Sequence, residues 1–172
     1  MAGGVGGIGC TFLARPCRAS VPWSGRYVFS GGTREEDRRR EAVEKVVGEV
    51  NVMIRAFARD RILEGTAPKT PLDIHIDPSA NEGWLDSPTM PRISGPVNGS
   101  PFSWRTAKGD RNSVTLSLAS ESLLVRFLGD GADSRYQYRF LPDQGRMTLS
   151  VVIRHRMMPS PLRFRQSYRR RS

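Results

Sequence analysis

Alternating apolar and polar residues dominate the stretch 113–153, which reads SVTLSLASESLLVRFLGDGADSRYQYRFLPDQGRMTLSVVI. Every second residue of an extended chain faces the same side, so such alternation is typical of a half-buried strand. Gly, Pro, Asp and Ser separate the alternating segments over a few positions, which favours tight turns. The stretch therefore predicts consecutive antiparallel hairpins. A last strand follows at 162–168, with Leu162, Phe164 and Tyr168 on its apolar face.

Upstream, the segment 26–30 is a short strand candidate that ends at Gly31-Gly32, after which the apolar period changes to that of a helix. We expect one long helix over about 33–63, with Thr33 and Glu36 forming a capping box at its start. Gly48 and Asn51 are positions where it would bend. Its apolar stripe consists of Val43, Val46, Val47, Val50, Met53, Ile54 and Phe57.

Residues 72–77 (LDIHID) alternate strictly and predict a strand whose Leu and Ile side chains point inward. Residues 78–112 are rich in Pro, Gly, Ser and Asn, and two short strands are expected within them. Asn98-Gly99 is a strong two-residue hairpin signal, which would pair the region 90–97 with 102–106.

These segments predict a mainly β fold: an antiparallel up-and-down β-barrel of about eight or nine strands, with one long amphipathic helix inserted after the first strand. A chain of 172 residues fits one domain, which we place at 25–172. No stretch has the roughly 20 apolar residues of a membrane-spanning helix.

The N-terminal segment 1–24 is expected to be disordered or processed. Cys10 and Cys17 both lie there, so neither a disulfide framework nor a metal cage follows from them. Gly7-Ile8-Gly9-Cys10 looks like a degraded lipoprotein cleavage box, which would place the protein in the cell envelope if the start site is misplaced; otherwise the compartment is cytoplasmic. The sequence leaves the localisation and the oligomeric state open.

Positive charge is concentrated at the C-terminus. The net charge is +10, and residues 135–172 hold ten arginines against one acidic residue, Asp143. Several of these arginines alternate with apolar residues on three neighbouring predicted strands, so they would form one anion-binding face. The alternative is that these arginines form an ordinary solvent-exposed face, and that their number reflects an arginine-rich proteome. The candidate anion-binding residues are Arg135, Arg139, Arg154, Arg163, Arg165 and Arg169.

Sites for catalysis, metals or cofactors find little support. Asp73, His75 and Asp77 share one face of a strand, but three such residues span about 13 Å and cannot all reach one ion. Gly4-x-Gly6-x-x-Gly9 matches a dinucleotide fingerprint, yet no strand can precede it. We therefore expect no cofactor, no metal site and no nameable catalytic residue, which favours a non-enzymatic protein.

Gly25-Arg26-Tyr27 at the first strand, the run of hairpins and the final strand beginning at Pro161-Leu162 resemble uncharacterised bacterial lipocalin-like barrels of calycin type. The resemblance covers roughly residues 25–170 by pattern and order, and it implies binding of an apolar ligand. Two features depart from that family. Lipocalins carry Gly-x-Trp at the first strand, and their helix follows the barrel.

The leading hypothesis is a non-enzymatic binding protein that holds a small apolar or amphipathic ligand inside the barrel. The candidate lining residues are Trp84, Trp104, Tyr136, Tyr138 and Phe140, which would otherwise be plain core. The alternative is a basic interaction module that binds a polyanion through the arginine face: an anionic membrane surface, nucleic acid or an acidic partner.

Overall fold

The computed structural model describes residues 24–171, and the predictions for the N-terminal segment, its two cysteines and the Gly7–Cys10 box lie outside these residues. Ten strands and two α-helices are present in the described chain. They are β1 (Gly25–Phe29), α1 (Gly32–Gly48), α2 (Arg55–Thr66), β2 (Leu72–Asp77), β3 (Glu82–Ser87), β4 (Met90–Pro96), β5 (Phe102–Arg105), β6 (Arg111–Ala119), β7 (Ser122–Gly129), β8 (Ala132–Leu141), β9 (Arg146–His155) and β10 (Leu162–Arg171), with a short 3-10 turn at Pro142–Gln144.

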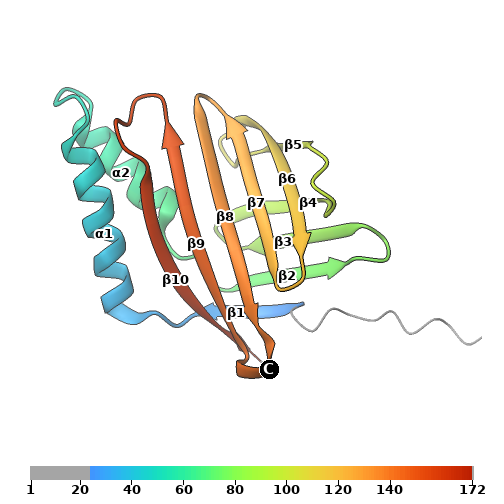
Figure 1. The fold of residues 1–172 in the computed structure, drawn as a ribbon. Coiled ribbons are helices and arrows are strands. Elements are labelled where there is room, and N and C mark those ends of the chain that lie inside the picture. Colours follow the sequence, from blue (N-terminus) through green and yellow to red (C-terminus); the bar gives the residue numbers. More distant parts are fainter. Residues whose placement is uncertain (1–23, 172) are drawn as a thin grey trace, which may run out of the picture.

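All ten strands belong to one antiparallel sheet, in the order β4-β3-β2-β1-β10-β9-β8-β7-β6-β5. In Figure 1, β1 to β4 cross behind the steep strands β6 to β10, so the sheet curls over on itself. The fold is therefore an up-and-down β-barrel, as predicted. The number of strands is ten, which is more than the eight or nine expected.

The two edge strands of the sheet, β4 and β5, do not form the hairpin that Asn98-Gly99 predicted. β4 pairs with β3, and β5 pairs with β6. The turn segment instead bonds to β6: Leu118 N donates to Val97 O at 2.9 Å and Gly99 N donates to Leu116 O at 2.8 Å. Trp104 Nε1 also donates to Arg92 O across the gap, at 3.0 Å. These few contacts draw the two edges together.

The predicted single helix over 33–63 is two helices, because the chain leaves α1 after Gly48. Asn51 Oδ1 accepts a bond from Met53 N at 2.9 Å, which stabilises a turn. Arg55 donates to the carbonyl oxygens of Gly48 and Val50 at the end of α1. This break separates the predicted apolar stripe, and Met53 and Phe57 are 88% and 69% exposed.

The predicted capping box at Thr33 is also wrong, since α1 begins at Gly32 without a side-chain cap. Glu35 instead accepts hydrogen bonds from Ser167 N and Ser167 Oγ, at 2.7 and 2.6 Å. These bonds attach the start of α1 to β10. Further along α1, Val43, Val46 and Val47 are buried against Leu162 of β10.

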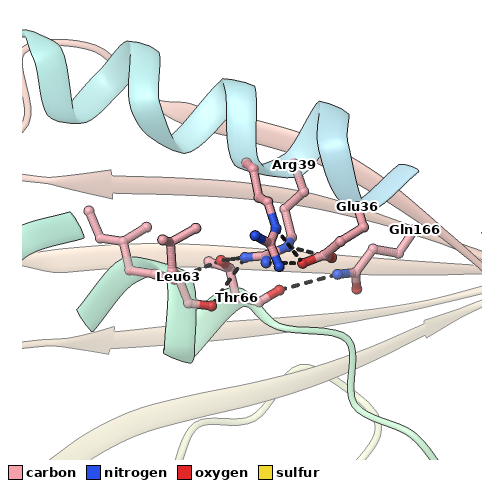
Figure 2. Close-up of polar contacts among 7 residues, drawn as sticks. Glu36, Arg39, Leu63, Thr66 and Gln166 are labelled. Atoms are coloured by element: carbon pink, nitrogen blue, oxygen red, sulfur yellow. Dashed lines mark hydrogen bonds and ion pairs between the residues drawn. The ribbon is translucent and has the colours of Figure 1, made fainter. Parts of the chain in front are cut away.

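A buried polar network joins both helices to the sheet (Figure 2). Arg39 on α1 is 3% exposed, and it donates to Glu36, to Leu63 O at 3.1 Å and to Thr66 Oγ1 at 2.7 Å. Gln166 on β10 then donates to Thr66 O at 3.2 Å. The Arg39 charge is thus paired and satisfies groups at the C-terminal end of α2, as a buried charge requires.

Replacing Glu36 by glutamine tests this network. Hydrogen bonds from Arg39 lower the pKa of the Glu36 carboxyl. A lowered folded-state pKa adds stability above the unfolded-state value of about 4.3, and that contribution is lost as pH falls through the folded-state pKa. Thermal unfolding should show a lower Tm for Glu36→Gln at pH 7 and a smaller difference from wild type at pH 3. An equal difference at both pH values would contradict the network.

Gly95→Ala tests the packing across the β4–β5 gap. A Cβ atom at Gly95 would lie 2.4 Å from Cε1 of Phe102, so the ring must move. We expect a loss of roughly 1–3 kcal/mol in urea unfolding, typical of overpacking. Gly65→Ala is the matched control, because nothing lies within 4 Å of its Cβ position. If both variants unfold like wild type, Phe102 does not hold this gap.

Candidate functional site

The inward side chains differ in exposure between the two ends of the barrel, which are the lower and upper ends in Figure 1. At the lower end, near the β6–β7 and β8–β9 turns, Phe140, Met147 and Tyr168 are each 1% exposed. Toward the upper end, which holds the β7–β8 turn and the β9–β10 loop, the inward Ile153 and Phe164 are only half-buried. Val114 and Leu162 at the same end are fully buried, so the accessible surface of the upper half is confined to particular side chains.

A chain of aromatic rings lies in this upper half. Trp104 of β5 contacts Phe127 of β7 with ring centroids 5.5 Å apart, and Phe127 contacts Tyr136 of β8 at 5.4 Å. Both pairs are edge-on, a favourable geometry for aromatic side chains. All three residues are half-buried although they pack against the core. They therefore offer accessible apolar surface at inward positions.

Three hydroxyl groups follow one another on the inner face of β8, at Ser134, Tyr136 and Tyr138. None of them hydrogen-bonds to another group within residues 24–171. The only fully enclosed side-chain polar atom without a partner in this part of the chain is Arg55 Nε, so the three oxygens are not sealed from solvent. Burial nevertheless raises the pKa of Tyr136 to about 12 and that of Tyr138 well above 10.

The structure brings together three of the five predicted lining residues, namely Trp104, Tyr136 and Tyr138. Phe140 also points inward, but it packs with Tyr27 at a centroid distance of 6.1 Å in the filled lower half. Trp84 lies on the outer face. Its ring stacks on His75 at 5.5 Å and has the Arg92 guanidinium 4.6 Å from its centroid.

The prediction that Trp84 lines the interior is therefore wrong. β3 places Gly83 and Leu85 on its buried face, so Trp84 between them faces outward. Phe127, Ile153, Phe164 and Ser134 were missed as lining residues, although the alternation of their strands carried the signal. Ser134 is two positions from Tyr136, and Phe164 belongs to the apolar face predicted for the last strand. Phe127 and Ile153 fall on apolar positions of the alternating stretch 113–153.

All six predicted arginines are exposed on the outer face of three neighbouring strands. Arg135 of β8 and Arg163 of β10 both lie opposite Val152 of β9 in the sheet register. Asp133 is the single acidic residue of these three fully described strands. It bonds to Arg126 at 2.9 Å and to Arg135 at 3.3 Å, and these arginines lower the pKa of its carboxyl. The acid is thus fully engaged, and the face remains strongly positive.

Other candidate chemistry is not assembled. Within residues 24–171, no cluster of three or more His, Cys, Asp and Glu side chains could hold a metal ion. Asp73 instead pairs with Arg26 at 2.8 Å. Surface depressions of about 350 and 570 Å³ lie beside the β5–β6 pair and between the β7–β8 and β9–β10 connections, and neither is lined by Trp104, Phe127 or Tyr136. No helix of the described chain has the length and apolar character to cross a membrane.

Comparison with protein-family models gives no match, and neither does comparison with curated protein sequences. Solved structures do match. "REP1-NXSQ fatty acid transporter" has a TM-score of 0.53 at 17% identity, covering 87% of this chain and 96% of that chain. Caenorhabditis elegans lipid binding protein 8 gives 0.53 at 11% identity, with coverage of 87% and 96%. Wild-type fluorescent protein UnaG gives 0.54 at 14%, with coverage of 87% and 97%.

At these identities the likeness establishes the fold alone: this chain shares an up-and-down β-barrel with those proteins. The bacterial lipocalin-like label and the assignment of 25–172 as one domain stay predictions.

Proposed function

We propose that the protein is a non-enzymatic carrier that binds a small apolar or amphipathic ligand in the upper half of the barrel. The observation that carries this proposal is the chain of inward but half-buried rings at Trp104, Phe127 and Tyr136. Apolar surface left accessible inside a barrel is where an apolar molecule gains most by leaving water.

The free energy of burying an alkyl chain is large enough for such a ligand to bind. Each buried methylene contributes about 0.8 kcal/mol, so a chain of about ten would contribute roughly 8 kcal/mol before the cost of association is subtracted. The helices are the natural cover for this site, because Ile153 and Phe164 contact the helix cluster around Val43 and Val47 as well as the barrel core.

Two structural neighbours support the proposal through what they are described to do, one as a fatty acid transporter and one as a lipid binding protein. Within residues 24–171, the buried polar groups on the inner face of the barrel are hydroxyls and an amide, which supply no acid and base pair for catalysis.

Native mass spectrometry of protein purified gently from its own cells should show a non-covalent adduct that is lost on denaturation. Trp104 should report the same ligand, because its ring lies within the site. Adding dodecanol to stripped protein should change the tryptophan fluorescence of wild type and of Trp84→Phe. The change should be much smaller in Trp104→Phe. A clean mass together with no fluorescence response would refute the carrier.

A second candidate function rests on a separate observation, the six exposed arginines of β8, β9 and β10. We propose that this arginine face docks the protein to an anionic surface. Tyr136, Tyr138 and Phe164 point inward from the same strands, so the face lacks the exposed rings that single-stranded nucleic acid would stack on. Anionic lipid headgroups need only the charges.

Sedimentation with phosphatidylserine vesicles at low and high salt tests the docking face. Arg163→Gln combined with Arg165→Gln should weaken binding at low salt by roughly 30-fold, at about 1 kcal/mol per arginine. Arg26→Gln combined with Arg92→Gln is the control with the same loss of charge on β1 and β4, outside the three strands of the arginine face, and each of these arginines pairs with an aspartate. If both double variants lose the same affinity for the vesicles, binding depends on net charge and not on the arginine face.

A further inference from the structure

We propose that the barrel selects a neutral amphipathic lipid over an ionised fatty acid, and that the Ser134, Tyr136 and Tyr138 hydroxyls of β8 bind its head group. The inference rests on the proposed function and adds the chemical class of the ligand. It concerns the inner face alone and is independent of the arginine face.

The three hydroxyls form a line on one strand. Residues two apart on a strand lie about 6.6 Å apart and face the same side, so the line runs from the upper end of the barrel toward its filled lower half. Ser134 lies opposite Phe127 and Ile153 in the sheet, and Tyr136 lies opposite Val125 and Val151. The hydroxyls are thus polar groups on an otherwise apolar wall.

The inward tyrosine of β10 differs from them. Tyr168, the inward tyrosine of β10, is 1% exposed and its hydroxyl donates to Gln166 Oε1 at 3.2 Å. Tyr138 is almost as deeply buried, at 6%, yet its hydroxyl makes no hydrogen bond to a group of the described chain. Because solvent reaches these oxygens in the free protein, a ligand that displaces it would leave costly unpartnered hydroxyls unless one of its own groups accepts and donates hydrogen bonds there.

The interior offers no counter-ion for a carboxylate. Among the buried residues of the described chain, the charged one is Arg39, which belongs to α1 and is paired with Glu36. Lys69, half-buried in the loop after α2, lies near Glu64 and Arg39, and burial lowers its pKa. Burial also raises the pKa of Tyr136 to about 12, so the same surroundings oppose a negative charge on a ligand.

Binding of hexadecanol, hexadecanoate and hexadecane to the full chain separates the possibilities. At pH 7.5 we expect hexadecanol to bind at least about tenfold more tightly than hexadecanoate, because an unpaired buried carboxylate is penalised far more than a hydroxyl. Hexadecanoate should gain affinity as the pH is lowered and its carboxyl is protonated. Hexadecane reports the apolar contribution alone.

Tyr136→Phe and Tyr138→Phe keep the rings and remove the hydroxyls. Each should weaken hexadecanol binding several-fold and leave hexadecane unchanged. Tyr168→Phe is the matched control, since its hydroxyl is already bonded to Gln166, and it should keep the preference for the alcohol.

Three outcomes would overturn the inference in different ways. Equal or tighter binding of hexadecanoate, above all if Lys69→Met abolishes it, would leave a carrier of anionic lipid and refute neutral selection. A preference for the alcohol that survives both tyrosine variants would refute the role of the β8 hydroxyls. Failure of all three ligands, hexadecane included, would refute the carrier itself.

Discussion

The pairing of β1 holds the two halves of this molecule together. β1 is five residues long, and it lies between β2 and β10, so it joins the first four strands to the last six. Its register with β10, from Arg26 opposite Arg171 to Phe29 opposite Tyr168, connects the two ends of the described chain. Without that pairing, the hairpins β2–β4 and β5–β10 would remain two separate sheets with exposed edges.

Because β1 is short, it leaves the upper part of β10 without a strand on that side, and the helices take the place of a strand. Figure 1 shows α1 and α2 beside β10. Ser30 N donates to Ser167 O at 2.8 Å, Glu35 bonds to Ser167, and Gln166 reaches Thr66 at the end of α2. The buried Arg39 then fastens α1 to α2. The helical cover is therefore attached at its base, whereas its tip, with Met53 and Phe57, stays exposed.

Local rules explain why the sequence predicted most of this fold. β6 to β10 and β2 were found because alternation and turn residues act between neighbours, and the same alternation separates inward tyrosines from outward arginines on β8. Features that depend on contacts between distant parts of the chain could not be predicted. Asn98-Gly99 has the chemistry of a tight hairpin, but bonds from Val97 and Gly99 to β6 outcompete it. Arg55, which donates to the end of α1 from seven residues beyond it, has no periodic sequence signal either.

β8 shows how one strand can carry two chemistries. Its outward positions include Arg135 and Arg139, and its inward positions include Ser134, Tyr136 and Tyr138, because successive side chains point to opposite faces. A slip of one residue would bury arginines and expose tyrosines, so the barrel can fold in only one register. The same constraint keeps the arginine charges of β8 outside the barrel. β8 places its guanidinium groups outside the barrel and its hydroxyl groups inside, so its inner face is polar without being charged.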